Sequence, residues 1–558
     1  MSSRYSIGLD YGTNSVRSLV VNIATGEEVG ACVYDYPHGE AGILLDPKDP
    51  HLARQHPVDH VKGAEVALSK AVAAAAGKDR DFSPEAVVGI GVDTTGSTPL
   101  PVDRNGKPLA FDPAFADNLD AMAYLWKDHT GTAEAAEITA LAAKMRPAYL
   151  RKCGGVYSSE WFFSKILHCL RRAPRVFDAA YIWVECSDWV PAILTGTDAP
   201  ATIQRDICAA GHKAMFNTDW GGYPDKEFLA ALDPKMGALR SKLSDTCVAA
   251  DQAVGGLTKE WAAKTGLRAG TPVAAGAFDA HLGAVGSGIM PGQMVQILGT
   301  SACQMVIAAA GISLPDIPGV CGVVNGAIVP GHFGIETGQS AVGDVYNWFV
   351  NYLQPGGPEN GSHRALTERA SRLKPGESGL LALEWNNGNR CVLVDYRLGG
   401  LLLGQTLQTR PEEIYRALIE ATAFGFLVII NRVEEYGVKV DSVINCGGIA
   451  DKNPLVLQIY ADVTGRPMRL SRSAQTCALG AAVAGAAAGG GHPSFAAAQK
   501  AMTGLKETEY KPNARNHAVY RDLFALYKDL HDAFGTREWK GNLAHVMKRL
   551  IEIRERVE

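Results

Sequence analysis

The chain contains one local pattern twice: a short strand of buried type, a Gly-Thr turn and a second strand. The first copy spans residues 6–23 and turns at Gly12 and Thr13, and the second spans residues 294–307 and turns at Gly299 and Thr300. The two turns stand 287 residues apart, close to half of the 558-residue chain. Because the flanking strand patterns match as well as the turns, we predict an internal duplication that folds into two related lobes.

The length and the order of elements fit that prediction. A chain of 558 residues is too long for one hydrophobic core, and its length alone suggests about two to four domains. Strands of buried type alternate with helical patterns over residues 61–76, 133–144 and 158–172, which indicates α/β layers. We place the main boundary near residue 288, with an N-terminal domain over residues 1–288 and a C-terminal domain over residues 289–558.

Charge and cysteine usage narrow the class of protein. Lys and Arg number 54 against 59 Asp and Glu, so the chain has no basic excess for a nucleic-acid partner. The eleven cysteines occur singly, and their odd number argues against a closed disulfide framework and favours a reducing compartment. The N-terminus lacks the design of a signal peptide, and the uncharged stretch 477–499 is rich in Ala and Gly, which is typical of a packing helix. We therefore expect a soluble, cytoplasmic protein with no membrane partner.

The first Gly-Thr turn has features of a phosphate site. Glycine lets backbone N–H groups approach phosphate oxygens, and the hydroxyls of Thr13 and Ser15 add donors. Asp10, at the end of the preceding strand, would hold a hydrated Mg²⁺. A single motif of this kind is more often a plain hairpin, but two copies half a chain apart favour lobes that clamp a nucleotide between them. No G-x-x-x-x-G-K-[ST] segment is present, which removes the P-loop route.

Asp279 is a candidate catalytic base. It follows an apolar run and stands where a helix begins, a place from which a carboxylate can accept the proton of an attacking hydroxyl. The alternative is that Asp279 is an ordinary helix N-cap, which the segment taken alone favours. His281 is a second candidate base, although a structural histidine is the commoner case.

A glycine turn after a strand in the second half offers a nucleotide-binding surface. Backbone without side chains at Gly447 and Gly448 can lie against an adenine ring, and Asn453 can bond its edge or the ribose. Taken alone this pattern is weak. Lys213 and Glu336 occur in polar or glycine-rich surroundings, where isolated charged residues are most often surface groups.

Taken together, these segments resemble the FGGY family of carbohydrate kinases. The resemblance covers essentially the whole chain and is carried, in order and spacing, by Asp10-Tyr11-Gly12-Thr13-Asn14-Ser15-x-Arg17, the Asp279 segment, Gly299-Thr300-Ser301, and Asn445-x-Gly447-Gly448 to Asn453. It implies an actin-like, hexokinase-like ATPase fold of class α/β, with two ribonuclease-H-like domains flanking a catalytic cleft.

Within the family the chain looks most like the bacterial L-ribulokinases. The longer runs that carry this likeness are 91–99, 125–129, 154–161, 210–213 and 336–344. Other branches commonly have Trp-Asp-Arg where this chain has Trp126-Lys127-Asp128, which argues against a glycerol kinase or a xylulokinase. The likeness implies phosphorylation of L-ribulose at its 5-hydroxyl, with ATP as donor and Mg²⁺ as cofactor, in arabinose catabolism.

The family resemblance also assigns roles to single residues. Asp279 would be the general base and would touch the sugar, and Asp10 would position Mg²⁺. The phosphates would meet Gly12, Thr13, Asn14, Arg17, Gly299 and Thr300. Adenosine would meet Gly447, Gly448 and Asn453, and the sugar hydroxyls would meet Lys213, Glu336 and the backbone around Gly96 and Ser97.

Several alternatives stay open at this stage. The nearest is a sister enzyme, a D-ribulokinase or another ketopentose or pentitol kinase with the same base. An actin- or chaperone-like ATPase is a rival from another class, but such a protein needs no sugar base. A pure sugar-binding protein would not need two phosphate turns. The sequence does not fix the selectivity among sugars, an allosteric ligand or the oligomeric state, for which a homodimer is one option.

Overall fold

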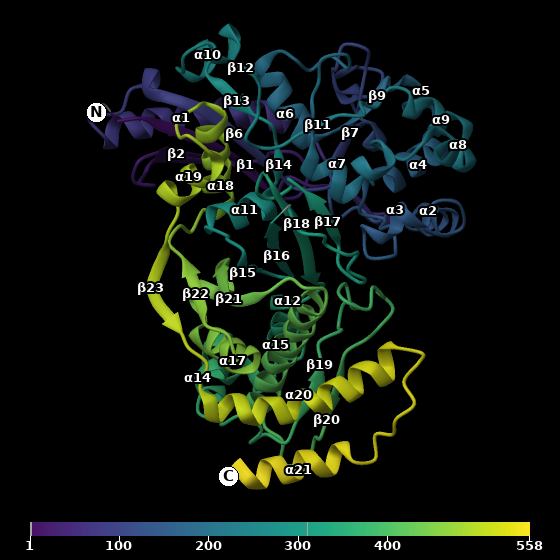
Figure 1. Ribbon diagram of the computed structural model, residues 1–558, viewed down its shortest axis with the longest axis vertical. Coiled ribbons are helices and arrows are strands. Elements are labelled where there is room, and N and C mark those ends of the chain that lie inside the picture. Colours follow the sequence, from purple (N-terminus) through teal and green to yellow (C-terminus); the bar gives the residue numbers. More distant parts are fainter. Residues whose placement is uncertain (1–2, 310, 558) are drawn as a thin grey trace.

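The computed structural model describes residues 3–309 and 311–557. Within these residues, two seven-stranded sheets form the centres of two lobes, which lie one above the other in Figure 1. The first sheet has the order β12-β13-β6-β1-β2-β3, with β14 also paired to β6, and the second has the order β17-β18-β16-β15-β21-β22-β23.

The strands of the first sheet are β1 (Tyr5–Tyr11), β2 (Ser15–Asn22), β3 (Glu28–Asp35), β6 (Val87–Thr94), β12 (Ala253–Gly256), β13 (Pro272–Ala274) and β14 (Ala277–Phe278). Those of the second are β15 (Gly292–Leu298), β16 (Ala302–Ala309), β17 (Gly322–Asn325), β18 (His332–Gln339), β21 (Val440–Cys446), β22 (Met468–Ser471) and β23 (Leu505–Tyr510). Smaller sheets contain β4 (Leu44–Asp46), β5 (Asp49–Gln55), β7 (Pro99–Val102), β8 (Ala123–Tyr124), β9 (Ile182–Glu185), β10 (Arg205–Asp206), β11 (Cys247–Val248), β19 (Leu381–Leu383) and β20 (Leu401–Leu403).

The helices before the second sheet are α1 (Pro57–Lys78), α2 (Thr132–Met145), α3 (Pro147–Arg151), α4 (Phe162–Arg172), α5 (Pro174–Ala179), α6 (Cys186–Thr195), α7 (Ile207–Lys213), α8 (Lys226–Leu232), α9 (Pro234–Arg240), α10 (Lys259–Thr265) and α11 (Asp279–Gly286). The helices that follow β18 in the chain are α12 (Gly343–Asn347), α13 (Gly357–Asn360), α14 (His363–Ala370), α15 (Pro411–Glu435), α16 (Gly448–Lys452), α17 (Pro454–Thr464), α18 (Thr476–Ala488), α19 (Phe495–Met502), α20 (Ala514–Gly535) and α21 (Val546–Val557).

The two sheets repeat one arrangement. β1 runs antiparallel to β2 and parallel to β6, and β15 runs antiparallel to β16 and parallel to β21. β1 is buried along its whole length, as a central strand covered on both faces must be. The related strands and their Gly-Thr turns therefore occupy equivalent places in the two lobes, as the duplication predicts.

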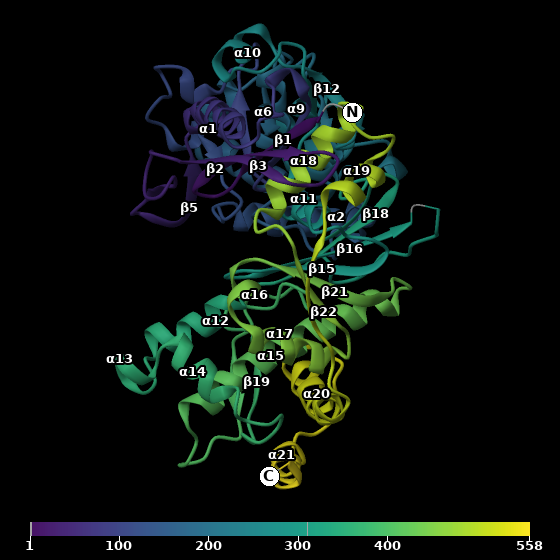
Figure 2. The ribbon, with the colours of Figure 1, turned by 90° about the vertical axis from the view of Figure 1, so that its left-hand side faces the viewer.

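One helix from late in the chain packs on the first sheet. Helix α18 lies against β1 and β6 and beside α11, and its yellow ribbon stands among the purple strands in Figures 1 and 2. The approach is close, because a Cβ atom on Gly8 of β1 would lie 1.8 Å from the carbonyl oxygen of Ala478. The predicted boundary near residue 288 falls between α11 and β15, and the chain then returns to the first sheet with α18.

The small-residue stretch 477–499 contains a packing helix, α18, as its composition predicts, and then the first residues of α19. In α18 the residues from Ala478 to Ala486 are buried. Across the two described stretches of the chain, no helix combines the length and the hydropathy that crossing a membrane requires.

Candidate active site

A cavity of about 250 Å³ is lined by residues that follow β1 and β6 of the first sheet and by residues of β15, β16 and β18 of the second. The predicted site residues that line it are Thr13, Gly96, Lys213, Asp279, Gly299, Thr300 and Glu336. They come from both lobes, and residues far apart in sequence, such as Thr13 and Thr300, share one space. The other predicted residues, Asp10, Gly12, Asn14, Arg17, Ser97, Gly447, Gly448 and Asn453, are not part of its lining.

Three buried carboxylates gather at one edge of the first sheet. Asp10 is the last but one residue of β1 and pairs in register with Asp93 of β6. Strand β14, which pairs with the end of β6, leads directly into Asp279. Burial, and then the charge of Asp10, raises the pKa of Asp279 to about 7. Burial also raises the pKa of Asp10, although the Arg17 guanidinium, 3.0 Å from its carboxylate, acts in the opposite direction.

Asp93 was not among the predicted site residues. Burial, followed by the charges of Asp10 and Asp279, raises its pKa well above the ordinary range. Neither carboxylate oxygen has a hydrogen-bond donor among residues 3–309 and 311–557. The sequence alone could have indicated Asp93 as a site residue, because it stands at the end of a strand-like apolar run and precedes a glycine turn, as Asp10 does.

Asp10 and Asp93 also fit a divalent cation. Mg²⁺ takes oxygen ligands and keeps several waters, so one or two carboxylates at the rim of a cleft suit it. A cation bound here would favour the ionised form of Asp93, whose side-chain oxygens have no hydrogen-bond partner among the described residues. The donor set at this edge is therefore of the kind that Mg²⁺ requires.

The structure separates the two interpretations of Asp279. Helix α11 has Phe278 at its N-cap position, so the simple N-cap alternative is wrong. Asp279 Oδ1 accepts a hydrogen bond from the N–H of Ala280 at 2.6 Å, which fixes the carboxylate at the cavity wall. His281 also lines the cavity, but its Nε2 lies 3.2 Å from Glu336 Oε2 and its Nδ1 lies 2.6 Å from Cys208 Sγ. Both ring nitrogens of His281 thus have partners within the protein, whereas Asp279 is held at the cavity wall by one backbone N–H.

Glu336 of β18 lies at the centre of a buried cluster of nitrogen donors. Lys213 Nζ, at the end of α7, donates to both carboxylate oxygens at 2.8 Å. Arg390 Nη2 adds a contact of 3.3 Å, and His281 adds the one described above. Although burial alone raises the pKa of a carboxyl, Lys213 and His281 bring the pKa of Glu336 well below its ordinary range. The cluster offers fixed donors and an ionised acceptor, which suit the hydroxyls of a neutral polyol.

The segment around Gly96 contributes only backbone atoms to the cavity wall. Gly96 lines the cavity, and Phe278 occupies the position that a Cβ atom on it would need, with ring carbons 2.0 Å away. The Ser97 side chain is buried behind it and donates to the carboxylate of Glu185, while its carbonyl accepts from Lys165 Nζ at 2.7 Å. Ser97 is therefore a supporting residue whose side chain points away from the cavity.

The two Gly-Thr turns expose backbone to open space. A Cβ atom on Gly12 would have Ser15 O as its nearest neighbour at 3.5 Å, and one on Gly299 would have Ser301 O at 3.6 Å. Neither glycine is required by packing, so the space beside both turns is free for a ligand. Thr13 Oγ1 is held by a hydrogen bond from the indole N–H of Trp126 at 3.0 Å.

Asn14 and Arg17 are occupied within the protein. Asn14 Nδ2 donates to Ala41 O at 2.5 Å, and Arg17 pairs with Asp10. Neither lines the cavity.

The predicted adenosine segment follows β21 and lies next to the second turn. Gly447 has φ +94° and a Cβ there would lie 2.5 Å from Leu298 O, so only glycine fits. Gly448 begins α16, and a Cβ on it would meet no atom within 4 Å. Asn453 caps α17 through Val456 N and donates to Thr367 Oγ1 at 3.3 Å, so both ends of its amide already have partners.

Comparison of the sequence with known protein families identifies the family to which this site belongs. Residues 5–286 match the N-terminal domain of the FGGY family of carbohydrate kinases, and residues 294–489 match its C-terminal domain. The chain therefore belongs to the FGGY family of carbohydrate kinases, and it is an enzyme that uses ATP to phosphorylate a sugar.

Individual relatives match this chain over nearly its full length. A ribulokinase of Shouchella clausii is 44% identical, with 100% of this chain and 99% of the relative covered. A ribulokinase of Vibrio parahaemolyticus is 40% identical over 94% of this chain and 95% of its own.

Solved structures show the same fold. The xylulose kinase of Rhodospirillum rubrum has a TM-score of 0.76 at 24% identity, over 95% of this chain and 100% of that one. The glycerol kinase of Plasmodium falciparum with ADP has a TM-score of 0.76 at 14% identity, over 95% of this chain and 98% of that one. The predicted actin-like, hexokinase-like α/β fold is thereby confirmed.

Sequence reasoning also gave no role to several other residues of the cavity wall. Among them are the polar or charged side chains of Trp126, Glu160 and Arg390. Trp126 and Glu160 lie in runs that carry the family resemblance, and Trp126 contacts Thr13 at the first Gly-Thr turn. Arg390 lies in a loop outside those runs, where no local periodicity distinguishes a site residue from a surface one.

Proposed function

We propose that this enzyme transfers the γ-phosphoryl group of ATP to the 5-hydroxyl of L-ribulose, giving L-ribulose 5-phosphate and ADP, as a step of arabinose catabolism. The observation that carries the proposal is the 44% identity to a ribulokinase over the full length of both chains. The cavity supports it, because it joins a buried carboxylate to a cluster of polar groups and to both phosphate turns.

Asp279 acts as the general base in this proposal. Its carboxylate takes the proton of the 5-hydroxyl while that oxygen forms a bond to the γ-phosphorus and the bond from that phosphorus to the bridging oxygen of ADP breaks. A pKa of about 7 keeps much of the carboxylate ionised at neutral pH and still gives it useful basicity. The Ala280 N–H holds it in one orientation.

Lys213, Glu336 and the Gly96 backbone bind the remaining sugar hydroxyls. Lys213 and Arg390 donate and Glu336 accepts, so a hydroxyl that is missing or inverted leaves a buried polar group unpaired. Such an unpaired group costs more than a lost contact, which is how the cluster distinguishes between sugars.

The nucleotide lies between the two turns in this proposal. The backbone of Gly12 and Gly299 and the hydroxyls of Thr13 and Thr300 face the phosphates, with support from Asn14 and Arg17. The adenosine lies against Gly447 and Gly448, near Asn453. Asp10, with Asp93 beside it, would hold Mg²⁺, which neutralises charge on the phosphate oxygens.

A substrate panel tests the proposal. ADP release is measured with L-ribulose, D-ribulose, D-xylulose, L-arabinose and ribitol, and with no sugar, at saturating MgATP. We expect the highest kcat/KM with L-ribulose and a product phosphorylated at O5 by NMR. A higher kcat/KM with D-ribulose or ribitol would make the enzyme a sister kinase, and equal ATP turnover without sugar would make it an ATPase.

The setting of the enzyme is part of the proposal. All eleven cysteines are free thiols, which suits the cytoplasm. We propose a homodimer as the assembly to test, and light scattering after size exclusion gives the mass directly.

A further inference from the structure

Two cysteines far apart in sequence meet beside the sugar-binding cluster. The Sγ atoms of Cys321 and Cys391 lie 3.5 Å apart, and both side chains are buried. The N–H of Cys321 donates to the carbonyl oxygen of Glu336 at 2.8 Å, and Cys391 directly follows Arg390, whose guanidinium contacts the Glu336 carboxylate. Each cysteine therefore lies in a segment that contacts Glu336: Cys321 does so through its own N–H, and Cys391 does so through its neighbour Arg390.

A small molecule can reach one member of this pair, Cys321. A second cavity, of about 210 Å³, is lined by Cys321, Arg390 and Glu160, and the latter two residues also line the sugar cavity. The thiol pair thus adjoins a space that neighbours the active site.

Cys321 has the properties of a reactive thiol. Its hydrogen bond with Cys391, together with the nearby Arg390 guanidinium, overcomes burial and lowers its pKa to about 7. A thiolate is the reactive form of cysteine, and the lowered pKa favours that form at Cys321 over its partner Cys391, whose pKa the same hydrogen bond raises. Cys153 lines the same cavity, but burial raises the pKa of its thiol to about 12.

We propose that Cys321 and Cys391 form a reversible disulfide on exposure to a hydroperoxide, and that this modification weakens sugar binding. The Cys321 thiolate attacks one peroxide oxygen, the O–O bond breaks, and a sulfenic acid and hydroxide result. Cys391 then attacks the sulfenic sulfur, forming the S–S bond and releasing water. In sum, two thiols and one hydrogen peroxide give one disulfide and two waters, and a dithiol reverses the change.

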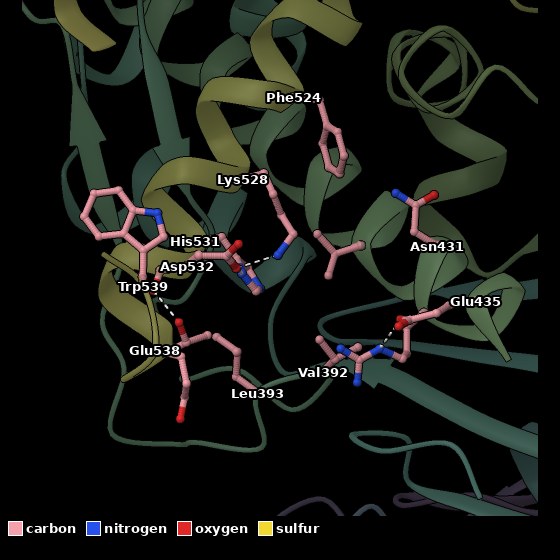
Figure 3. Close-up of a pocket in the computed structure, with 13 residues that line it drawn as sticks. Val392, Leu393, Asn431, Glu435, Phe524, Lys528, His531, Asp532, Glu538 and Trp539 are labelled. Atoms are coloured by element: carbon pink, nitrogen blue, oxygen red, sulfur yellow. Dashed lines mark hydrogen bonds and ion pairs between the residues drawn. The ribbon is translucent and has the colours of Figure 1, made fainter. Parts of the chain in front are cut away.

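The bond requires the two segments to move. A disulfide holds its sulfurs about 2.05 Å apart, so the Sγ atoms must approach by more than an ångström. The segment of Cys391 is not tightly packed on every side, because Val392 and Leu393 line a cavity of about 500 Å³ between α15 and α20 (Figure 3). Movement of this segment shifts Arg390 against Glu336, and this consequence for sugar binding rests on the proposed function of that cluster.

The chemical step is tested on the reduced full-length enzyme, without a ligand. It is treated with one equivalent of hydrogen peroxide, digested under non-reducing conditions and analysed by mass spectrometry. We expect a cross-linked peptide pair that contains Cys321 and Cys391 and disappears after dithiothreitol. In Cys391→Ser we expect dimedone to label Cys321 instead. Oxidation that produces other products and leaves this pair reduced overturns the proposal, whatever substrate the enzyme uses.

The functional step is tested by kinetics before and after oxidation. We expect oxidation to raise the KM for L-ribulose at least about fivefold, to change the KM for ATP by less than twofold, and to be reversed by dithiothreitol. Cys153→Ser, the matched control, should respond as the wild type does, and Cys321→Ser and Cys391→Ala should not respond. Equal inactivation of Cys391→Ala overturns the coupling, because oxidation then acts at another thiol. A reduced enzyme with no activity on L-ribulose refutes the proposed function, and the mass-spectrometric result still decides the disulfide.

Discussion

Replacement of Asp279 by Asn tests the catalytic assignment and predicts opposite effects on activity and stability. Asparagine keeps the shape of the side chain and an oxygen that can accept the Ala280 N–H bond, but it takes up no proton from a hydroxyl. Loss of a general base typically costs about 10²–10⁴-fold in rate, so we expect kcat to fall by that factor with the KM for ATP nearly unchanged.

The stability effect follows from the raised pKa. The pKa of Asp279 rises from 3.8 to about 7 on folding, so between these values the folded protein holds a proton that the unfolded chain releases. The stability of the wild type therefore falls as the pH rises through this window, and above pH 7 the ionised carboxylate costs up to about 4 kcal/mol. An asparagine side chain carries no such charge, so Asp279→Asn is expected to be the more stable protein at pH 8, with a smaller difference, below about 2 kcal/mol, at pH 5.

Two measurements on the same preparations check this reasoning. Coupled ADP release at saturating L-ribulose gives kcat, and denaturant unfolding at pH 5 and pH 8 gives the two stability differences. A variant with turnover within threefold of wild type would show that Asp279 is not the base. A variant less stable than wild type at pH 8 would show that the carboxylate is not desolvated in the way its burial implies.

The remaining predictions concern the nucleotide, the metal, pH and closure. Gly448→Val should raise the KM for ATP at least about tenfold with an unchanged melting temperature, because its Cβ meets open space, whereas Gly447→Val should lower the melting temperature through its contact with Leu298. Asp10→Asn should require a Mg²⁺ concentration at least about tenfold higher for half-maximal activity, which a Mg²⁺ titration measures. The wild-type kcat/KM should fall about tenfold per pH unit below pH 7, because Asp279 must be ionised to accept a proton. A non-reactive ATP analogue with L-ribulose should shrink the radius of gyration seen by X-ray scattering, and identical curves would contradict a closing cleft.

The local pattern of apolar residues and glycines predicted the strands and turns well, because these elements depend on residues that are neighbours in the sequence. The strand before Gly12 and the one before Gly299 were both predicted, because runs of apolar residues that end in glycine have few alternative structures. Helix α4 was predicted from residue 158 but begins at Phe162, because Trp161 takes an extended conformation. Helix boundaries depend on such capping conformations, which the apolar period does not encode.

The sequence predicted residues of the candidate site only where they lie in a recognisable motif. Asp279 and Thr300 lie in short glycine-containing segments whose order along the chain carries the family resemblance. Arg390 lies in a loop and reaches Glu336 across 54 residues of sequence, so only the folded chain shows their contact. The Cys321–Cys391 pair is of the same kind, since each cysteine stands alone in the sequence.

The chain contains 60 glycines, and several of them serve in packing and not in turns. Glycines in β1, β6, α11 and α18 allow one backbone to touch another. A Cβ on Gly91 of β6 would lie 1.8 Å from Ala481 O, and one on Gly286 of α11 would lie 1.9 Å from Thr476 O. Helix α18 is thus a common platform for the elements that carry Asp10, Asp93 and Asp279, and it holds the three carboxylates in a fixed relation. A closing motion would then bring the turn at Thr300 toward a carboxylate cluster that keeps its own geometry.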